Sequence, residues 1–139
     1  MNKKTSSGAI AEKLFEMWAS GNWVMERTQP ETKVVYIGNK PTVIHLKSKG
    51  QPDYTGYEMC QVGVQKIPIF RAVEVKEAIG NSMPCCRLGS MKDTRSQNYW
   101  MSRHEPSLCC FVFVLWSDNT YELFKWKEKG SYKKGCGFK

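Results

Sequence analysis

Three residues in the middle of the chain have the types and spacing needed to hold a cation. Glu74 and Lys76 stand two apart in Val73-Glu74-Val75-Lys76, so on a strand their side chains share one face and the two valines point to the other, into the core. Asp53 precedes Glu74 with twenty residues between them, enough for a strand, a turn and a return strand. We expect such a hairpin to bring both carboxylates and the ammonium group together.

A group of this composition is suited to phosphodiester hydrolysis. Two carboxylates and an intervening backbone carbonyl form a hard oxygen site of the kind that Mg²⁺ prefers, and Mn²⁺ can substitute. The cation would polarise a phosphoryl oxygen and lower the pKa of a bound water. Lys76 could orient that water or stabilise developing charge. The alternative is a solvated Glu-Lys ion pair, which is common on exposed strands and contributes little.

The elements that must position these residues are a capped helix, several strands, a second helix and a final hairpin. Ser6 and Ser7 can cap a helix that runs to about Ser20, and a polar helix is expected from about Ser90 to His104, after a loop over 80–89. Extended runs are expected at 23–28, 33–37, 42–47, 53–59, 66–78, 108–116 and 120–126. This order predicts an α/β fold whose mixed central sheet is flanked by helices.

The first helix carries two acids at different distances from its apolar stripe. The stripe is predicted from Ile10, Leu14, Met17 and Trp18, widened by Ala11 and Phe15. At about 100° per residue, Glu12 lies near the border of that stripe and Glu16 almost opposite its centre. Glu12 is therefore the better candidate for an inward-facing acid, and two solvated carboxylates are the alternative.

Charge favours a polyanionic partner. The chain has 139 residues, a net charge of +8 and a pI near 9.2, and basic side chains displace counterions from a phosphate backbone. No apolar run is long enough to cross a bilayer. Met1-Asn2-Lys3-Lys4 is not followed by an apolar run, so we expect no secretory signal and a cytoplasmic location, in the host if a phage encodes the chain. We expect one domain over 1–139, with a basic tail from about 127.

The P-D…E-x-K pattern resembles the PD-(D/E)xK nuclease superfamily, and within it the RecU-type Holliday junction resolvases. That family's ordered segments are similar to Lys40-Pro41-Thr42, Asp53-Tyr54-Thr55-Gly56-Tyr57, Val73-Glu74-Val75-Lys76-Glu77, Arg87-Leu88-Gly89-Ser90 and Gln97. Pro52 stands where the family has Thr or Ser. Only ten residues lie between Thr42 and Asp53, which predicts little room for the protruding stalk by which the family engages the junction centre.

The resemblance implies a restriction-endonuclease-like core and a role for each matched residue. Asp53, Glu74 and the Val75 carbonyl would bind Mg²⁺, and Lys76 would be the catalytic lysine. Glu12 matches the first-helix acid that often completes such sites. Gln97 matches a glutamine of the second helix that steadies the site or its substrate, although an exposed polar residue is the alternative.

The resulting functional prediction is a Mg²⁺-dependent endonuclease that cuts branched DNA, such as four-way junctions, as a homodimer. The alternatives are another PD-(D/E)xK endonuclease, of restriction or repair type, and a catalytically inactive DNA-binding module. Trp126 could stack on an unpaired base or pack as a strand-end aromatic. The candidate DNA-binding residues are Lys47, Lys49, Arg95, Trp126 and Lys127.

Overall fold

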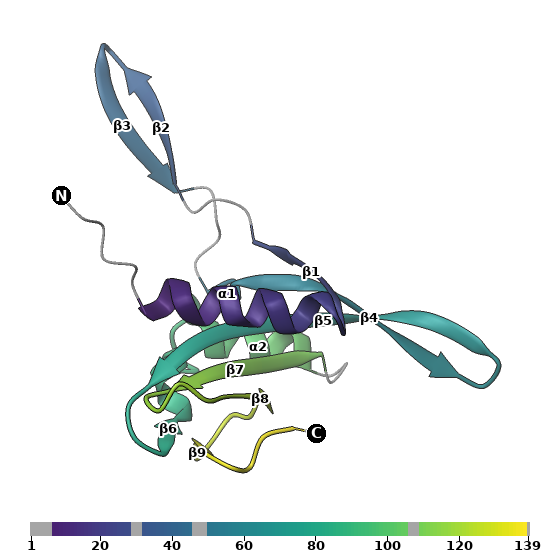
Figure 1. The fold of residues 1–139 in the computed structure, drawn as a ribbon. Coiled ribbons are helices and arrows are strands. Elements are labelled where there is room, and N and C mark those ends of the chain that lie inside the picture. Colours follow the sequence, from purple (N-terminus) through teal and green to yellow (C-terminus); the bar gives the residue numbers. More distant parts are fainter. Residues whose placement is uncertain (1–6, 29–31, 46–49, 106–108, 139) are drawn as a thin grey trace.

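A mixed five-stranded sheet forms the centre of the computed structural model, which describes residues 7–28, 32–45, 50–105 and 109–138 (Figure 1). The strand order is β1-β4-β5-β7-β8, in which β5 and β7 are parallel and the other neighbours antiparallel. The predicted α/β class with a mixed central sheet is confirmed. The strands are β1 (Val24–Arg27), β4 (Tyr54–Val62), β5 (Gln65–Ala78), β7 (Cys110–Trp116) and β8 (Tyr121–Lys125).

Helix α1 (Ser7–Ser20) covers one face of this sheet (Figure 1). Ala11, Phe15 and Ala19 are buried and recur every fourth residue, so they share one helix face. The ring of Phe15 meets those of Tyr54 and Phe113, and the two small alanines let the helix approach the sheet closely. The sheet residues of this core are Tyr54, Val73, Val75, Phe111, Phe113, Leu115 and Leu123.

The contact face of α1 differs from the predicted stripe. Ile10 and Met17 are 46% and 65% exposed, because the helix turns its Ala11–Phe15–Ala19 row to the sheet. The prediction that Glu12 lies further inward than Glu16 is confirmed, since the two side chains are 25% and 48% exposed.

The second face of the sheet is covered by α2 (Gln97–His104) and by short elements that the sequence pattern did not predict. The segment expected as a loop contains β6 (Ser82–Pro84) and the 3₁₀ helix η1 (Cys85–Leu88). The C-terminal segment contributes β9 (Ser131–Lys133), which pairs with β6. Part of the predicted basic tail is therefore ordered structure against the core.

Helix α2 begins seven residues later than predicted. The side chains of Ser90 and Asp93 accept hydrogen bonds from the backbone N–H groups of Lys92 and Arg95, and such local bonds compete with a helix. Ser96 then caps α2 by accepting from the backbone N–H of Tyr99. Over the ranges described, no helix is both long and apolar enough to span a bilayer.

A hairpin projects from the molecule before Asp53. Strands β2 (Thr32–Ile37) and β3 (Lys40–His45) pair only with each other among the described strands, and they extend away from the central sheet (Figure 1). The two turn residues, Gly38 and Asn39, have φ of 56° and 68°, as a tight hairpin turn requires. The expectation of little room for a protruding element is wrong, because this hairpin is built largely from residues before the Thr42–Asp53 interval.

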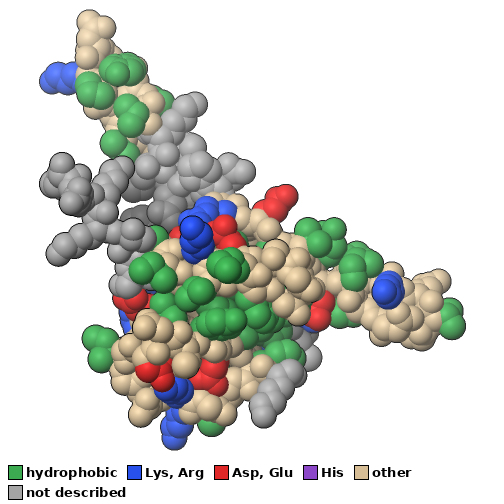
Figure 2. Space-filling model, viewed as in Figure 1, with side chains coloured by type: hydrophobic (Ala, Val, Ile, Leu, Met, Phe, Trp, Pro, Cys, Tyr) green, Lys and Arg blue, Asp and Glu red, His purple; other side chains and the backbone are tan. Residues whose placement is uncertain are grey.

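Apolar side chains are exposed on this hairpin and on a second projecting ribbon formed by the outer ends of β4 and β5 (Figures 1 and 2). Val34, Tyr36 and Val43 share one face of the β2–β3 hairpin, because Val34 pairs with Val43 and alternate residues share a face. On the β4–β5 ribbon, Met59 and Val64 are exposed. Neither ribbon is sandwiched between the helical layers that bury the central strands.

Gly56 of β4 lies opposite Met25 of β1, where there is no room for a side chain. A Cβ there would meet the Val24 carbonyl oxygen and come within 2.8 Å of the Met25 Cα. We expect Gly56→Ala to lower the free energy of unfolding by about 1–3 kcal/mol, because backbone atoms cannot move aside as a flexible side chain can. Urea unfolding measures it. Gly21→Ala, whose Cβ would have no neighbour closer than 4.0 Å, is the control, and an equal loss in both would contradict the close-approach explanation.

Candidate active site at the open edge of β5

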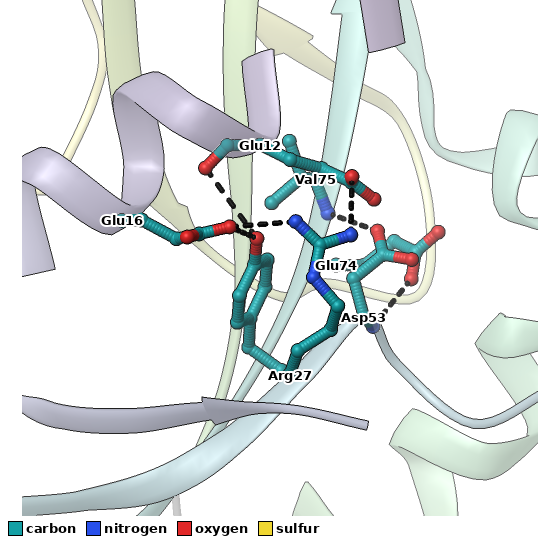
Figure 3. A network of polar contacts seen from close by, with 7 residues as sticks. Glu12, Glu16, Arg27, Asp53, Glu74 and Val75 are labelled. Atoms are coloured by element: carbon teal, nitrogen blue, oxygen red, sulfur yellow. Dashed lines mark hydrogen bonds and ion pairs between the residues drawn. The ribbon is translucent and has the colours of Figure 1, made fainter. Parts of the chain in front are cut away.

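The candidate site lies where β5 continues past the start of β4. Tyr54, the first residue of β4, pairs with Val73, so the next residues of β5 face a strand that has not yet begun. Asp53 fills this position with its side chain. The Val75 backbone N–H donates to Asp53 Oδ2 at 2.9 Å, and the Asp53 N–H donates to Glu74 Oε1 at 3.2 Å (Figure 3). The two acids are thus held together by reciprocal bonds to the main chain.

Lys76 supplies the positive charge beside this pair. Its Nζ lies 3.4 Å from Glu74 Oε2. The side chain of Glu74 is only 2% exposed and that of Lys76 24% exposed, so the carboxylate is removed from water while the ammonium remains partly accessible. A buried carboxylate needs such a partner, because desolvation of an unpaired charge is costly.

The predicted meeting of Asp53, Glu74 and Lys76 is confirmed as geometry. Val73 and Val75 are buried in the core beneath α1, as the alternation predicted. In an extended strand the N–H and C=O of one residue point to the same edge, so the Val75 carbonyl faces the edge at which its N–H meets Asp53. Two carboxylates and one carbonyl at a single edge form a donor set that fits a hard divalent cation.

Glu12 is held by a different partner. Arg27 Nη1 lies 2.8 Å from Glu12 Oε2, and Arg27 Nη2 lies 2.7 Å from Glu16 Oε2 (Figure 3). Within the described part of the chain, no three Asp, Glu, His or Cys side chains gather closely enough to hold a metal ion. In this conformation Glu12 therefore does not complete a three-acid group with Asp53 and Glu74.

Tyr54, on the face of the sheet beneath α1, contacts both Glu16 and Arg27. Its hydroxyl donates to Glu16 Oε2, and its ring lies 5.5 Å from the Arg27 guanidinium carbon. The hydrogen bond from Tyr54 lowers the pKa of Glu16 below its ordinary value, with Arg27 acting in the same direction. Burial, followed by the bond to Glu16, raises the pKa of Tyr54. The phenol therefore stays a donor to a charged carboxylate.

Gln97 stands at the first position of α2, and its side chain is partly buried. The start of α2 lies against the segment that leads to Asp53, since a Cβ at Gly50 would come within 2.6 Å of the Ser96 carbonyl oxygen. The structure therefore brings the beginning of α2 near the Asp53 loop. A role for Gln97 in steadying the site or its substrate stays a prediction.

The candidate DNA-binding residues fall into three groups. Lys47 and Lys49 lie outside the described residues. Arg95 and Lys127 are exposed, and their contact with DNA stays a prediction. Trp126 is only 7% exposed, and its indole N–H donates to Asn98 Oδ1 at 2.9 Å. The prediction that Trp126 stacks on a base is wrong, because its ring is committed to the core, as its packing alternative proposed.

Arg27 and Tyr54 were not identified as site residues from the sequence. A signal was present for the arginine, because Glu12 and Glu16 are four residues apart on one helix and such a like-charge pair calls for a cation. The chain has 21 lysines and arginines, and spacing does not say which one meets the two acids. Only the antiparallel pairing of β1 with β4, which sets Arg27 opposite Tyr54, resolves it.

Comparison with protein-family models gives no match for this chain, and a search of curated proteins gives none either.

Trp126→Phe tests the assignment of this residue to the core. Loss of the indole N–H leaves the buried Asn98 oxygen without that donor, so we expect about 1–2 kcal/mol less stability in urea unfolding. DNA affinity should not change. Trp100→Phe, at a partly exposed position, is the control. Loss of DNA affinity with unchanged stability would instead restore the base-stacking role.

Tyr54→Phe tests the hydrogen bond to Glu16. The pKa of Glu16 should rise toward its ordinary value, as followed by carboxyl ¹³C NMR. A depressed folded-state pKa stabilises the protein above the ordinary glutamate pKa, and this contribution is lost as pH falls through the folded value. The variant should therefore lose less stability over that acid window. Tyr57→Phe, at an exposed position on the same strand, should change neither the pKa of Glu16 nor the loss of stability in acid. An unchanged Glu16 pKa in Tyr54→Phe would contradict the assignment.

Proposed function

We propose that this chain is a divalent-metal-dependent endodeoxyribonuclease with a PD-(D/E)xK, restriction-endonuclease-like core. The observation that carries the proposal is the interlocked set at the open edge of β5. The Asp53 N–H donates a hydrogen bond to the Glu74 carboxylate, and the Val75 N–H donates one to the Asp53 carboxylate. Lys76 Nζ lies 3.4 Å from Glu74 Oε2. Asp53, Glu74 and the Val75 carbonyl would hold Mg²⁺ or Mn²⁺.

The chemistry divides between the cation and the chain. A bound divalent cation supplies a Lewis acid that polarises the phosphoryl oxygen and acidifies water. Asp53 is positioned by the Val75 N–H, and Glu74 by the Asp53 N–H, so both acids are preorganised. Lys76, partly exposed, can reach a phosphate at the same edge and stabilise the charge that develops there.

Charge and shape support a nucleic-acid substrate. A net charge of +8 favours a nucleic-acid backbone. The β2–β3 hairpin projects from the core just before Asp53 in the chain, where the RecU-type resemblance implies a stalk that engages a junction. Both features support branched DNA, with four-way junctions as the first candidate. Paired incision of two strands requires two active sites, which a two-fold homodimer would supply.

A cleavage assay on labelled four-way junction, flap and linear duplex, with Mg²⁺ and with Mn²⁺, tests this function. We expect nicking of the junction, and a loss of at least about a hundredfold in rate for Asp53→Asn and for Lys76→Ala, because each removes a group of the site. Glu128→Gln and Lys66→Ala, both exposed, are matched controls that should retain activity. Equal cleavage of linear duplex would remove the branched-DNA specificity, and sequence-specific duplex cleavage would point to a restriction-type or repair-type enzyme.

A non-catalytic DNA-binding module is the second candidate, favoured by one observation. Glu12 is bound to Arg27, and a three-acid group is not assembled in the described conformation. Junction binding without nicking under either metal, at protein concentrations that saturate the junction, would select this alternative over the nuclease.

A further inference from the structure

Arg27 is the centre of a charge arrangement that the proposed hydrolysis does not itself explain. Its guanidinium binds two carboxylates of α1 at once, one through each terminal nitrogen, at 2.8 Å from Glu12 and 2.7 Å from Glu16. The side chain is nevertheless 56% exposed. Exposed ion pairs contribute little to stability, so this fork is easily exchanged for another partner.

Arg27 is also tied to the candidate active site through the main chain. Thr28, the next residue, donates its backbone N–H to the Asp53 carbonyl at 2.9 Å, and its hydroxyl donates to the Pro52 carbonyl. Arg27 itself pairs with Tyr54 across the β1–β4 ladder. The guanidinium is therefore anchored one residue away from the strand position that carries Asp53.

The two carboxylates that share Arg27 are held unequally. Glu16 also accepts a hydrogen bond from the Tyr54 hydroxyl, so it keeps a partner when one nitrogen of Arg27 is given up. Glu12 would reach a divalent cation bound by Asp53 and Glu74 only by leaving Arg27.

We propose that Arg27 is an exchangeable counter-ion, which holds Glu12 in the metal-free protein and binds a phosphate of the nucleic acid once Glu12 turns to the cation. This inference rests on the proposed function. Arg27 stays attached to Glu16 through one nitrogen, and the nitrogen that leaves Glu12 donates to a phosphate oxygen. A planar guanidinium has donors for both partners, whereas an ammonium group acts as a point charge. Arg27 is thus a positioning residue for Glu12 and a contact for the backbone.

Mn²⁺ titration by calorimetry, without DNA, tests the first half of this proposal. Arg27→Met should bind Mn²⁺ about three- to fivefold more tightly than the unmodified protein, because Glu12 no longer has to break an exposed ion pair. Arg27→Lys, which keeps the charge but loses the fork, should fall between the two. Arg103→Met, an exposed arginine on α2, is the matched control and should not change Mn²⁺ affinity.

A double-mutant cycle separates the ion pair from a general effect of charge. If Arg27 acts through Glu12, Arg27→Met in a Glu12→Gln background leaves Mn²⁺ affinity unchanged. Tighter binding that persists in this background would overturn the proposal, because the arginine would then act only through its field. Circular dichroism of each variant confirms that the fold is retained.

Junction binding with Ca²⁺ in place of Mg²⁺, measured over a range of salt, tests the second half. Arg27→Met should bind the junction more weakly, and the slope of log affinity against log salt should fall by about one, the effect of one lost phosphate contact. Arg27→Lys should keep the slope.

The outcomes distinguish this proposal from the function on which it rests. Mn²⁺ binding by the unmodified protein that Arg27→Met leaves unchanged or weakens would overturn the role of Arg27 alone. An unmodified protein that binds no Mn²⁺ would overturn the metal-dependent function together with it.

Discussion

The hydrogen bond from the Val75 N–H to the Asp53 carboxylate is the contact on which the site depends. It exists because β5 is longer than β4 at this end, so that a main-chain donor faces the end of a strand rather than a partner residue. The Asp53 N–H then fixes Glu74, and Glu74 fixes Lys76. One difference in strand length therefore places three functional groups, with the sheet itself as the scaffold.

The two faces of the sheet contribute differently to this edge. Val73 and Val75 lie under α1, while Ala72 and Ala78 belong to the core on the α2 side, and Glu74 and Lys76 share their face by alternation. Arg27 lies on the α1 side, because it pairs with Tyr54, which packs under α1. Glu12 meets Arg27 there, beside the loop that carries Asp53 (Figure 3).

Local pattern was sufficient for the parts of the fold that depend on one segment or on adjacent segments. The alternation at 73–76 and the hairpin distance to Asp53 predicted the acid pair, because strand period and short-range pairing are properties of the sequence itself. The run expected to be extended at 108–116 contains β7 (Cys110–Trp116), and all residues of this strand are buried. The predicted start of the second helix near Ser90 was too early. Composition alone could not show this, because the turns before Gln97 depend on hydrogen bonds from side chains to the main chain.

Such local patterns could not predict contacts between distant segments. The pairing of β6 with β9 joins two three-residue strands, too short to show alternation, and the partners of Arg27 lie 11 and 15 residues away on another element. Trp126 donates its indole N–H to Asn98, 28 residues earlier in the chain, and no local pattern indicates that contact. In each case tertiary packing selects one partner among many of equal local merit.

Pro52, buried directly before Asp53, has a consequence for how the edge stays available. Proline has no N–H to donate and disfavours a continuing ladder. If β4 began two residues earlier, its main chain would compete for the backbone N–H and C=O of Val75. The longer strand would then cover the two carboxylates. The carbonyl of Pro52 accepts a hydrogen bond from the Thr28 hydroxyl. Pro52 therefore prevents β4 from pairing with Val75, and the backbone groups of Val75 stay available to the site.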